Sequence, residues 1–174
     1  ELQELLVSRK AAMAGRTLWL GDTEISRRRE SCMFNCSFTI VETVYDVVDV
    51  LWLLLQGCGV GFKPVTGTLN GFYKPIEDIC VVHTERTGKG GLEDNLETWN
   101  PDTKVWTLTV GDSAEAWAKS IGKLLAGKYS AKKLILDFSE IRPAGERLKG
   151  YGWISSGSDA IGRAYFEIAK ILNL

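Results

Sequence analysis

The sequence predicts an α/β domain, because segments with helical and strand-like apolar patterns alternate along it. Apolar residues recur at helical spacing at 44–56 and at 158–172, and a largely apolar run typical of a strand lies at 133–138. Internal repeats and low-complexity tracts are absent from the sequence. At 174 residues the chain has the length of one domain and can bury a substantial core.

In the first half of the chain, the pattern predicts two helices and a strand. A helix is expected over 1–14, with Gly15 closing it. A strand from Ser31 to Val41 follows three consecutive arginines. The second helix runs from about Val44 to Gln56 and stops at Gly57.

The second half begins with a polar stretch, 85–103, which ends in Asn-Pro-Asp and predicts an exposed loop or hairpin insertion. Asp112 and Ser113 give an N-cap signal for a helix to about Ala126. The strand at 133–138, a basic loop and a closing helix from about Ser158 to Leu172 complete the chain.

The basic loop, 141–152, is the most informative segment for function. It contains two arginines, a lysine and three glycines directly after an apolar strand. Glycines let a ligand approach the backbone, and fixed cations suit phosphorylated ligands. Loops after strands are also where α/β folds place their sites. A solvated basic turn would explain the same residues.

Composition narrows the class of protein. The net charge is −1, so no broad electrostatic attraction to nucleic acid or membrane is expected. The longest apolar run, 50–55, is far shorter than the roughly 20 residues of a membrane span. Four cysteines without a dense framework indicate a reducing compartment, and no signal pattern opens the sequence, so we expect a cytoplasmic protein.

Several motif classes are excluded. Cys80 and His83 offer two ligands where a structural zinc site takes four, so no metal site is expected. The glycines at 57–61 follow a helix pattern, which is the wrong order for a dinucleotide fingerprint. The glycine-rich stretch at 87–91 lacks the spacing of a phosphate-binding P-loop.

Cys32 and Cys36 fall in one predicted strand, where alternation places both side chains on the same face. At about 3.3 Å per residue their Cα atoms would lie about 13 Å apart. A disulfide tolerates roughly 7 Å, so these two cysteines cannot pair in an extended strand. A buried small apolar role is the alternative for either cysteine.

Five ordered blocks resemble segments of adenosylcobalamin-dependent (class II) ribonucleotide reductases. They are GRTLW at 15–19, NCSF at 35–38, GCGVGF at 57–62, DSAEAW at 112–117 and RPAGERLKGYGWISSG at 142–157. The last resembles the family segment RPxGxRLKxFGGxxSGP. The chain departs from the family pattern at Cys58, where glycine is usual, at Trp153, within a small-residue run, and at Ser158, where proline is common.

The resemblance implies the N-terminal half of a ten-stranded α/β barrel at 31–174, preceded by a helical segment at 1–30. The family's radical cysteine and most cobalamin contacts lie later in its sequence, so this chain alone would be inactive. The implied enzyme reduces ribonucleoside triphosphates to deoxyribonucleotides by thiyl-radical chemistry. Its implied partners are the ribonucleotide substrate, a deoxynucleoside triphosphate effector, a thioredoxin-type reductant, adenosylcobalamin and the C-terminal half of the barrel.

The resemblance also assigns roles to individual residues. Cys36, with Cys32 as the alternative, would be one of two reducing cysteines, paired with a cysteine from the second half of the barrel. Substrate-binding residues would be Ser37, Gly59 and Gly61. The specificity loop and effector region would involve Asp112, Ser113, Arg142, Gly145, Arg147 and Lys149.

Two other function classes fit the sequence. One is a non-catalytic nucleotide-binding or interaction module derived from the reductase half-barrel. The other is a stand-alone thiol oxidoreductase, which the absence of a Cys-x-x-Cys motif disfavours.

Overall fold

The computed structural model describes residues 1–83, 86, 91–148, 150 and 154–174. Its helices are α1 (Leu2–Val7), α2 (Gly15–Leu20), α3 (Glu24–Arg28), the 3-10 helix η1 (Glu30–Met33), α4 (Val44–Leu55), α5 (Ala114–Ala126) and α6 (Asp159–Leu172). Its strands are β1 (Cys36–Val41), β2 (Gly59–Pro64), β3 (Asp78–Val82), β4 (Leu96–Asn100), β5 (Val105–Thr109) and β6 (Lys133–Asp137).

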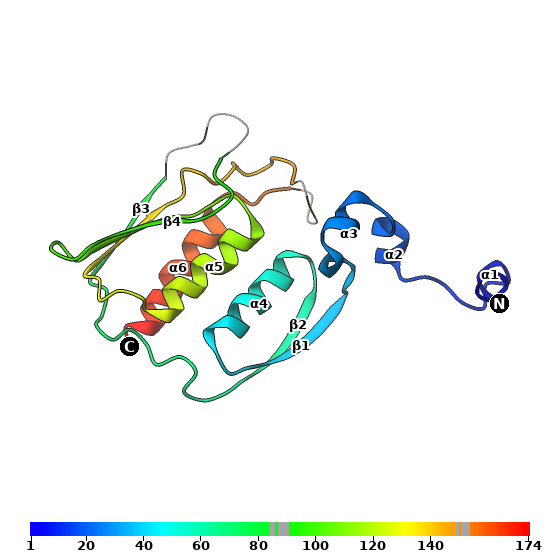
Figure 1. The fold of residues 1–174 in the computed structure, drawn as a ribbon, viewed down its shortest axis with the longest axis horizontal. Coiled ribbons are helices and arrows are strands. Elements are labelled where there is room, and N and C mark those ends of the chain that lie inside the picture. The colour runs from blue at the N-terminus through cyan, green and yellow to red at the C-terminus, as the bar shows by residue number, and fades with distance from the viewer. Residues whose placement is uncertain (84–85, 87–90, 149, 151–153) are drawn as a thin grey trace.

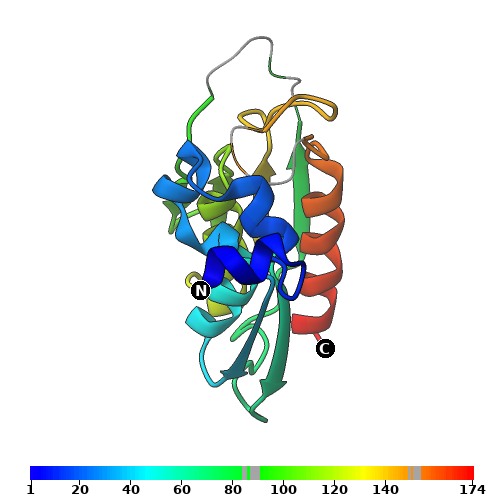
Figure 2. The same cartoon turned by 90° about the vertical axis from the view of Figure 1, so that its right-hand side faces the viewer.

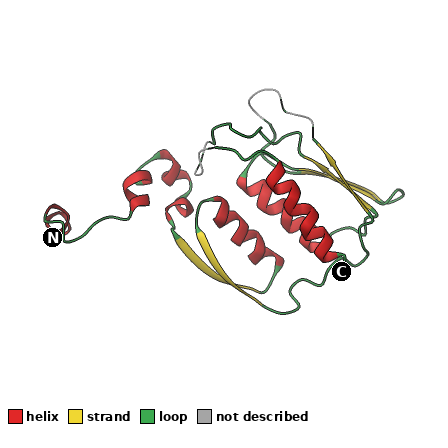
Figure 3. Cartoon of the chain, turned by 180° about the vertical axis from the view of Figure 1, so that it is seen from behind, coloured by secondary structure: helices red, strands yellow, loops and turns green. Residues whose placement is uncertain are grey.

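The described strands form two sheets with helices between them (Figures 1 and 3). Strands β1 and β2 pair in parallel, whereas the second sheet has the order β3-β6-β5-β4, with β4 antiparallel at one edge. Helices α5 and α6 cover one face of the larger sheet, and α4 lies between α5 and the smaller sheet. The predicted α/β class is confirmed. The ten-stranded barrel stays a prediction, because the described strands lie in two separate sheets.

The main core lies between the larger sheet and its two helices. Alternate residues of β5 and β6 are fully buried there, namely Trp106, Leu108, Leu134 and Leu136. Trp106 pairs with Leu134 and Leu108 with Leu136 across the parallel ladder, so their side chains share one face. Burial of each such side chain contributes about 1.5–3 kcal/mol, which makes this layer the principal source of stability.

The N-terminal segment differs from its prediction. The expected helix over 1–14 ends at Val7, and Gly15 begins α2 where it was expected to end the first helix. Arg9, with φ 58°, takes a left-handed conformation that interrupts the first helix. Figure 1 shows α1 beyond an extended stretch, away from the rest of the chain.

The predicted strand from Ser31 was wrong in its first part, because residues Glu30–Met33 form η1 and β1 begins at Cys36. The helices predicted at 44–56, 112–126 and 158–172 and the strand at 133–138 are confirmed within a residue or two. Within the predicted polar insertion, Leu96–Asn100 forms β4 and pairs with β5, as the hairpin alternative required. In the part of the chain that the structure describes, no helix has the length and apolarity to cross a membrane.

Candidate functional site

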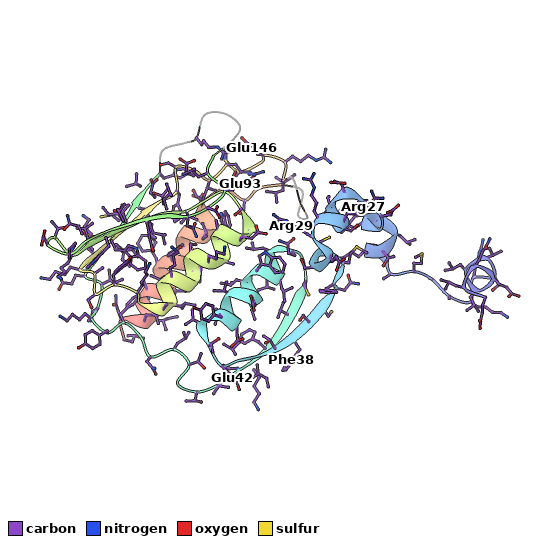
Figure 4. All side chains as sticks on the ribbon, in the orientation of Figure 1. Arg27, Arg29, Phe38, Glu42, Glu93 and Glu146 are labelled. Carbon is purple, nitrogen blue, oxygen red and sulfur yellow. The ribbon has the colours of Figure 1, made fainter. Side chains whose placement is uncertain are left out.

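The outer face of β1 exposes Cys36. Side chains alternate along the strand, so Cys36, Phe38 and Ile40 are exposed while Val41 is buried. Figure 4 shows Phe38 on the side of β1 that faces away from α4. The thiol of Cys36 is free and therefore open to a ligand or a second thiol approaching this face.

Cys32 lies in a different environment. It belongs to η1, its side chain is fully buried, and its thiol is free. The prediction that Cys32 and Cys36 share one face of an extended strand was wrong. Since redox reactivity requires access to the sulfur, the geometry favours Cys36 over Cys32 as a reactive cysteine.

Two predicted substrate-binding glycines lie beside Cys36 on β2. The parallel register pairs Cys36 with Gly59 and Phe38 with Gly61. A Cβ at Gly61 would lie 3.1 Å from Cδ2 of Phe38, whereas a Cβ at Gly59 would meet only the carbonyl oxygen of Asn35, at 3.6 Å. Gly61 therefore makes room for the Phe38 ring, and Gly59 leaves the space next to Cys36 open. The half-buried Ser37, also predicted to bind substrate, alternates onto the face toward α4.

Arg16 fixes the beginning of both strands. Its Nη1 donates to the carbonyl oxygens of Cys32 (3.1 Å) and Phe34 (2.6 Å), and its Nη2 donates to that of Gly57 (2.7 Å). The carbonyls of Phe34 and Gly57 lie two residues before Cys36 and Gly59, so one guanidinium helps to set where the two strands begin. In the sequence, Arg16 stands out only as a member of the GRTLW block at 15–19. Membership of that block is the one sequence signal that could have pointed to its anchoring role.

A second cluster forms around Asp112, at the carboxyl ends of the larger sheet's parallel strands. Arg86 Nη1 donates to Asp112 Oδ2 at 3.0 Å, and Arg142 Nε donates to the same oxygen at 2.9 Å. The three side chains are only 10–14% exposed. Arg86 also donates to the carbonyl oxygen of Glu140 at 2.7 Å. Hydrogen bonds between charged groups are stronger than those between neutral groups. Asp112 therefore joins its own loop to the loops that carry Arg86 and Arg142.

Ser113 was predicted, with Asp112, to lie in the effector region. Its hydroxyl accepts a hydrogen bond from the N–H of Ala116, at 3.0 Å, and donates to the carbonyl oxygen of Glu93, at 2.7 Å. The Ser113 hydroxyl therefore caps the N-terminus of α5 and anchors the loop at Glu93. Any contact of Asp112 or Ser113 with an effector stays a prediction.

The basic loop folds back on itself after Arg142. The N–H of Gly145 donates to the carbonyl oxygen of Ser155, at 3.0 Å, and Gly145 takes φ 91°, which favours glycine. Arg147 pairs with Ile154 in an isolated antiparallel bridge and its side chain is exposed. The guanidinium of Arg142 is thus held in an ion pair with Asp112, whereas the side chain of Arg147 is exposed to solvent. Lys149, also predicted to belong to the specificity loop, lies outside the described residues.

The comparisons with known proteins agree with this arrangement. A family model described as "B12-dependent ribonucleotide reductase, insertion domain" matches residues 81–172, which is more than half of the chain. The chain belongs to the B12-dependent ribonucleotide reductase family. The match begins within β3, so it covers most of the larger sheet with α5 and α6 and does not include β1 and β2.

Similar proteins include the adenosylcobalamin-dependent ribonucleoside-triphosphate reductases of Lactobacillus gasseri and Lactobacillus helveticus. They are 24% identical over 210 residues and 25% identical over 211 residues. Each alignment covers 99% of this chain and 28% of the relative, so the chain spans little more than a quarter of these reductases. The crystal structure of a B-12 dependent (class II) ribonucleotide reductase matches with a TM-score of 0.75 at 21% identity, over 98% of this chain and 28% of that one. That structural likeness shows the fold.

Besides the exposed Cys36, one other cysteine is not buried, namely the partly exposed Cys80 on β3 of the larger sheet. Its Sγ lies 3.5 Å from Asp78 Oδ1, and Lys133 Nζ lies 3.0 Å from Asp78 Oδ2. The hydrogen bond from Lys133 lowers the pKa of Asp78. Cys80 is on a different sheet from Cys36, which makes it a matched comparison for thiol experiments.

Proposed function

We propose that this chain is part of an adenosylcobalamin-dependent ribonucleoside-triphosphate reductase in which Cys36 supplies one of the two reducing thiols. The exposed thiol of Cys36, beside the open space at Gly59, is the observation that carries the proposal. The names of the relatives give the reaction, and the block NCSF at 35–38 gives the position.

The chemistry assigned to Cys36 is a two-electron reduction. The C2′–O bond of a ribonucleotide breaks and a C2′–H bond forms, with the oxygen leaving as water. Two thiols supply the two electrons and two hydrogens and become one disulfide. The second thiol would belong to a part of the reductase outside this chain, since Cys32 and Cys58 are buried and Cys80 lies on the other sheet.

The uncovered face around Cys36 supports the half-barrel part of the proposal, for residues 31–174. Phe38 is 66% exposed and Ile40 49%, and both share the face of β1 with Cys36. Exposed apolar patches of this kind mark surfaces that another protein segment covers. The remainder of the reductase barrel would cover this face and enclose the thiol of Cys36. The helical segment at 1–30 would then support the barrel from outside through Arg16.

The substrate and effector contacts follow from the loops. Backbone at Gly59 would lie against the nucleotide, because no Cβ there keeps it away, and Gly61, which makes room for the Phe38 ring, would border the same substrate site. The exposed Arg147, with Gly145 as its hinge, would contact the substrate or the deoxynucleotide effector, and Asp112 would hold that loop in place through Arg142. A thioredoxin-type protein would re-reduce the disulfide. All four cysteines are free, which supports a cytoplasmic setting.

Adenosylcobalamin, which the names of the relatives imply, would supply the radical chemistry of the reaction. Most of its contacts would lie in the rest of the reductase, and we assign none of its steps to residues of this chain.

Replacement of Cys36 tests the proposal. In the full-length reductase, Cys36→Ser should abolish conversion of CTP to dCTP over many turnovers with a thioredoxin-type reductant, because the disulfide can no longer form. Cys80→Ser, which alters a partly exposed thiol on the other sheet, should retain the wild-type rate. Undiminished turnover of the Cys36→Ser reductase would show that Cys36 is not a reductant.

A further inference from the structure

Glu115 on α5 contacts the two elements that lead into β1 and β2. Its Oε1 lies 3.2 Å from Nη2 of Arg29, which is the N-cap residue of η1. The same oxygen accepts a hydrogen bond from Nε1 of Trp52 on α4, at 3.2 Å. Since η1 precedes β1 and α4 precedes β2, one carboxylate holds the elements before both strands. The chemistry proposed for Cys36 gives Glu115 no role.

The carboxylate of Glu115 is held in one orientation. Nη2 of Arg29 also donates to its other oxygen, Oε2, at 3.3 Å, while the indole of Trp52 binds Oε1. The side chains of Arg29 and Glu115 are 40% and 34% exposed, whereas those of the neighbouring pair Arg28 and Glu24 are 77% and 66% exposed. Partly buried pairs are screened less by salt than exposed ones, so the pair between Arg29 and Glu115 is the stronger link.

The arrangement of the helices shows what this link joins. Helices α2 and α3 lie at one end of the layer that α4 and α5 form (Figures 1 and 2). Figure 4 shows Arg29 between α3 and α5. Glu115 therefore joins the segment that enters β1 to the helices that pack on the larger sheet.

The first turn of α5 is itself fixed to the loops of the Asp112 cluster. Glu115 follows Asp112 by three residues, and Ser113 caps the helix by accepting the N–H of Ala116 at 3.0 Å. Asp112 pairs with Arg142 at 2.9 Å. The carboxylate at position 115 thus keeps a fixed place relative to the loop that begins at Arg142.

On the other side, the link reaches the residues beside the reactive thiol. The carbonyl oxygen of Arg29 accepts the N–H of Cys32 at 3.1 Å, which closes the first turn of η1, and Cys36 is the third residue after this helix. Trp52 lies in the last turn of α4, after which the chain enters β2 at Gly59. A shift of Arg29 or Trp52 would therefore shift the beginning of β1 or β2.

We propose that Glu115 is a positioning residue of the reductase reaction, which sets the Cys36 thiol and the backbone of Gly59 at a fixed distance from the loop that carries Arg147. The inference rests on the reductase function proposed above. Glu115 transfers no proton or electron and acts through Arg29. Without its carboxylate, the thiol is no longer held against a nucleotide that the loop binds. Misplacement of a reacting group slows the chemical step more than it weakens binding.

Turnover of CTP by the full-length reductase tests the proposal. Glu115→Ala should lower kcat at least about tenfold and change KM less than about threefold, and Arg29→Ala should act in the same direction. The double variant should be no slower than Glu115→Ala alone, because both changes remove one ion pair. Arg28→Ala, which removes the neighbouring exposed pair, is the matched control and should keep the wild-type kcat.

Hydrogen exchange measured by mass spectrometry provides a readout that requires no catalysis. The N–H groups of Cys32 and Phe34, which bond within η1, should exchange at least about tenfold faster in Glu115→Ala, while β6 keeps its protection. Unchanged exchange, or faster exchange with the wild-type kcat, would overturn the positioning role. Loss of turnover in Cys36→Ser together with wild-type turnover in Glu115→Ala would overturn this inference alone. Turnover retained by Cys36→Ser would overturn the reductant role as well.

Discussion

Gly122 on α5 lies against Val48 on α4, so closely that a Cβ at Gly122 would come within 2.4 Å of Cγ2 of Val48. This contact joins the helix on the larger sheet to the helix on the smaller one. Glu115 reinforces the junction, because its carboxylate accepts a hydrogen bond from Nε1 of Trp52 on α4 at 3.2 Å and pairs with Arg29, also at 3.2 Å. The position of Cys36 relative to the Asp112 cluster therefore depends on α4 and α5 remaining packed.

Gly122→Val should destabilise the protein by about 1–3 kcal/mol, because the added methyl groups force α4 and α5 apart. Chemical denaturation followed by circular dichroism would measure the change. Gly15→Ala is the control, because a Cβ at Gly15 would meet nothing within 4 Å. If Gly122→Val unfolds at the wild-type denaturant concentration, the close packing of the two helices is wrong.

The sequence predicted the elements whose signals are local. Helices α4, α5 and α6 carry apolar stripes and, for α4 and α5, capping residues, and β6 has a continuous apolar centre, Leu134–Leu136. The first part of the predicted strand failed because Arg16, distant in sequence, binds the carbonyls at Cys32 and Phe34 while Glu30–Met33 turns into η1. The Asp112 cluster joins residues 26 and 30 positions away, and no local pattern encodes such pairs.

Arg16→Ala should loosen the entry to β1 and β2, since three main-chain carbonyls lose a charged donor, each worth about 1.5–3 kcal/mol. Reaction with a thiol reagent under native conditions would report the change, because the buried Cys32 should become reactive alongside Cys36. Arg27→Gln, which removes an exposed ion pair with Asp22, should leave thiol reactivity unchanged. Continued protection of Cys32 in Arg16→Ala would contradict the anchoring role.

Asp112→Ala should be among the most destabilising single changes in the loops. It leaves Arg86 and Arg142 without the carboxylate in a site that is 10–14% exposed, and loss of one partner of a buried ion pair typically costs about 3–5 kcal/mol. Limited proteolysis should cut the segment around Arg147 faster, because Arg142 no longer holds it. A matched Asp22→Ala variant, in an exposed pair, should be cut at the wild-type rate. Equal cleavage of both variants would show that Asp112 does not hold the loop.

Glu97 on β4 links stability to pH. Burial raises its pKa, but hydrogen bonds from Lys128 and Lys123 outweigh that effect and leave the pKa lowered. A carboxyl group with a lowered folded-state pKa stabilises the protein above its unfolded pKa of about 4.3, and this contribution is lost as the pH falls through the folded value. Glu97→Gln should therefore be less stable than the wild type at pH 7, and the difference should shrink below about pH 4. Denaturant titrations of both proteins at the two pH values would measure it, and a difference that stays constant with pH would show that Glu97 is not held ionised by these lysines.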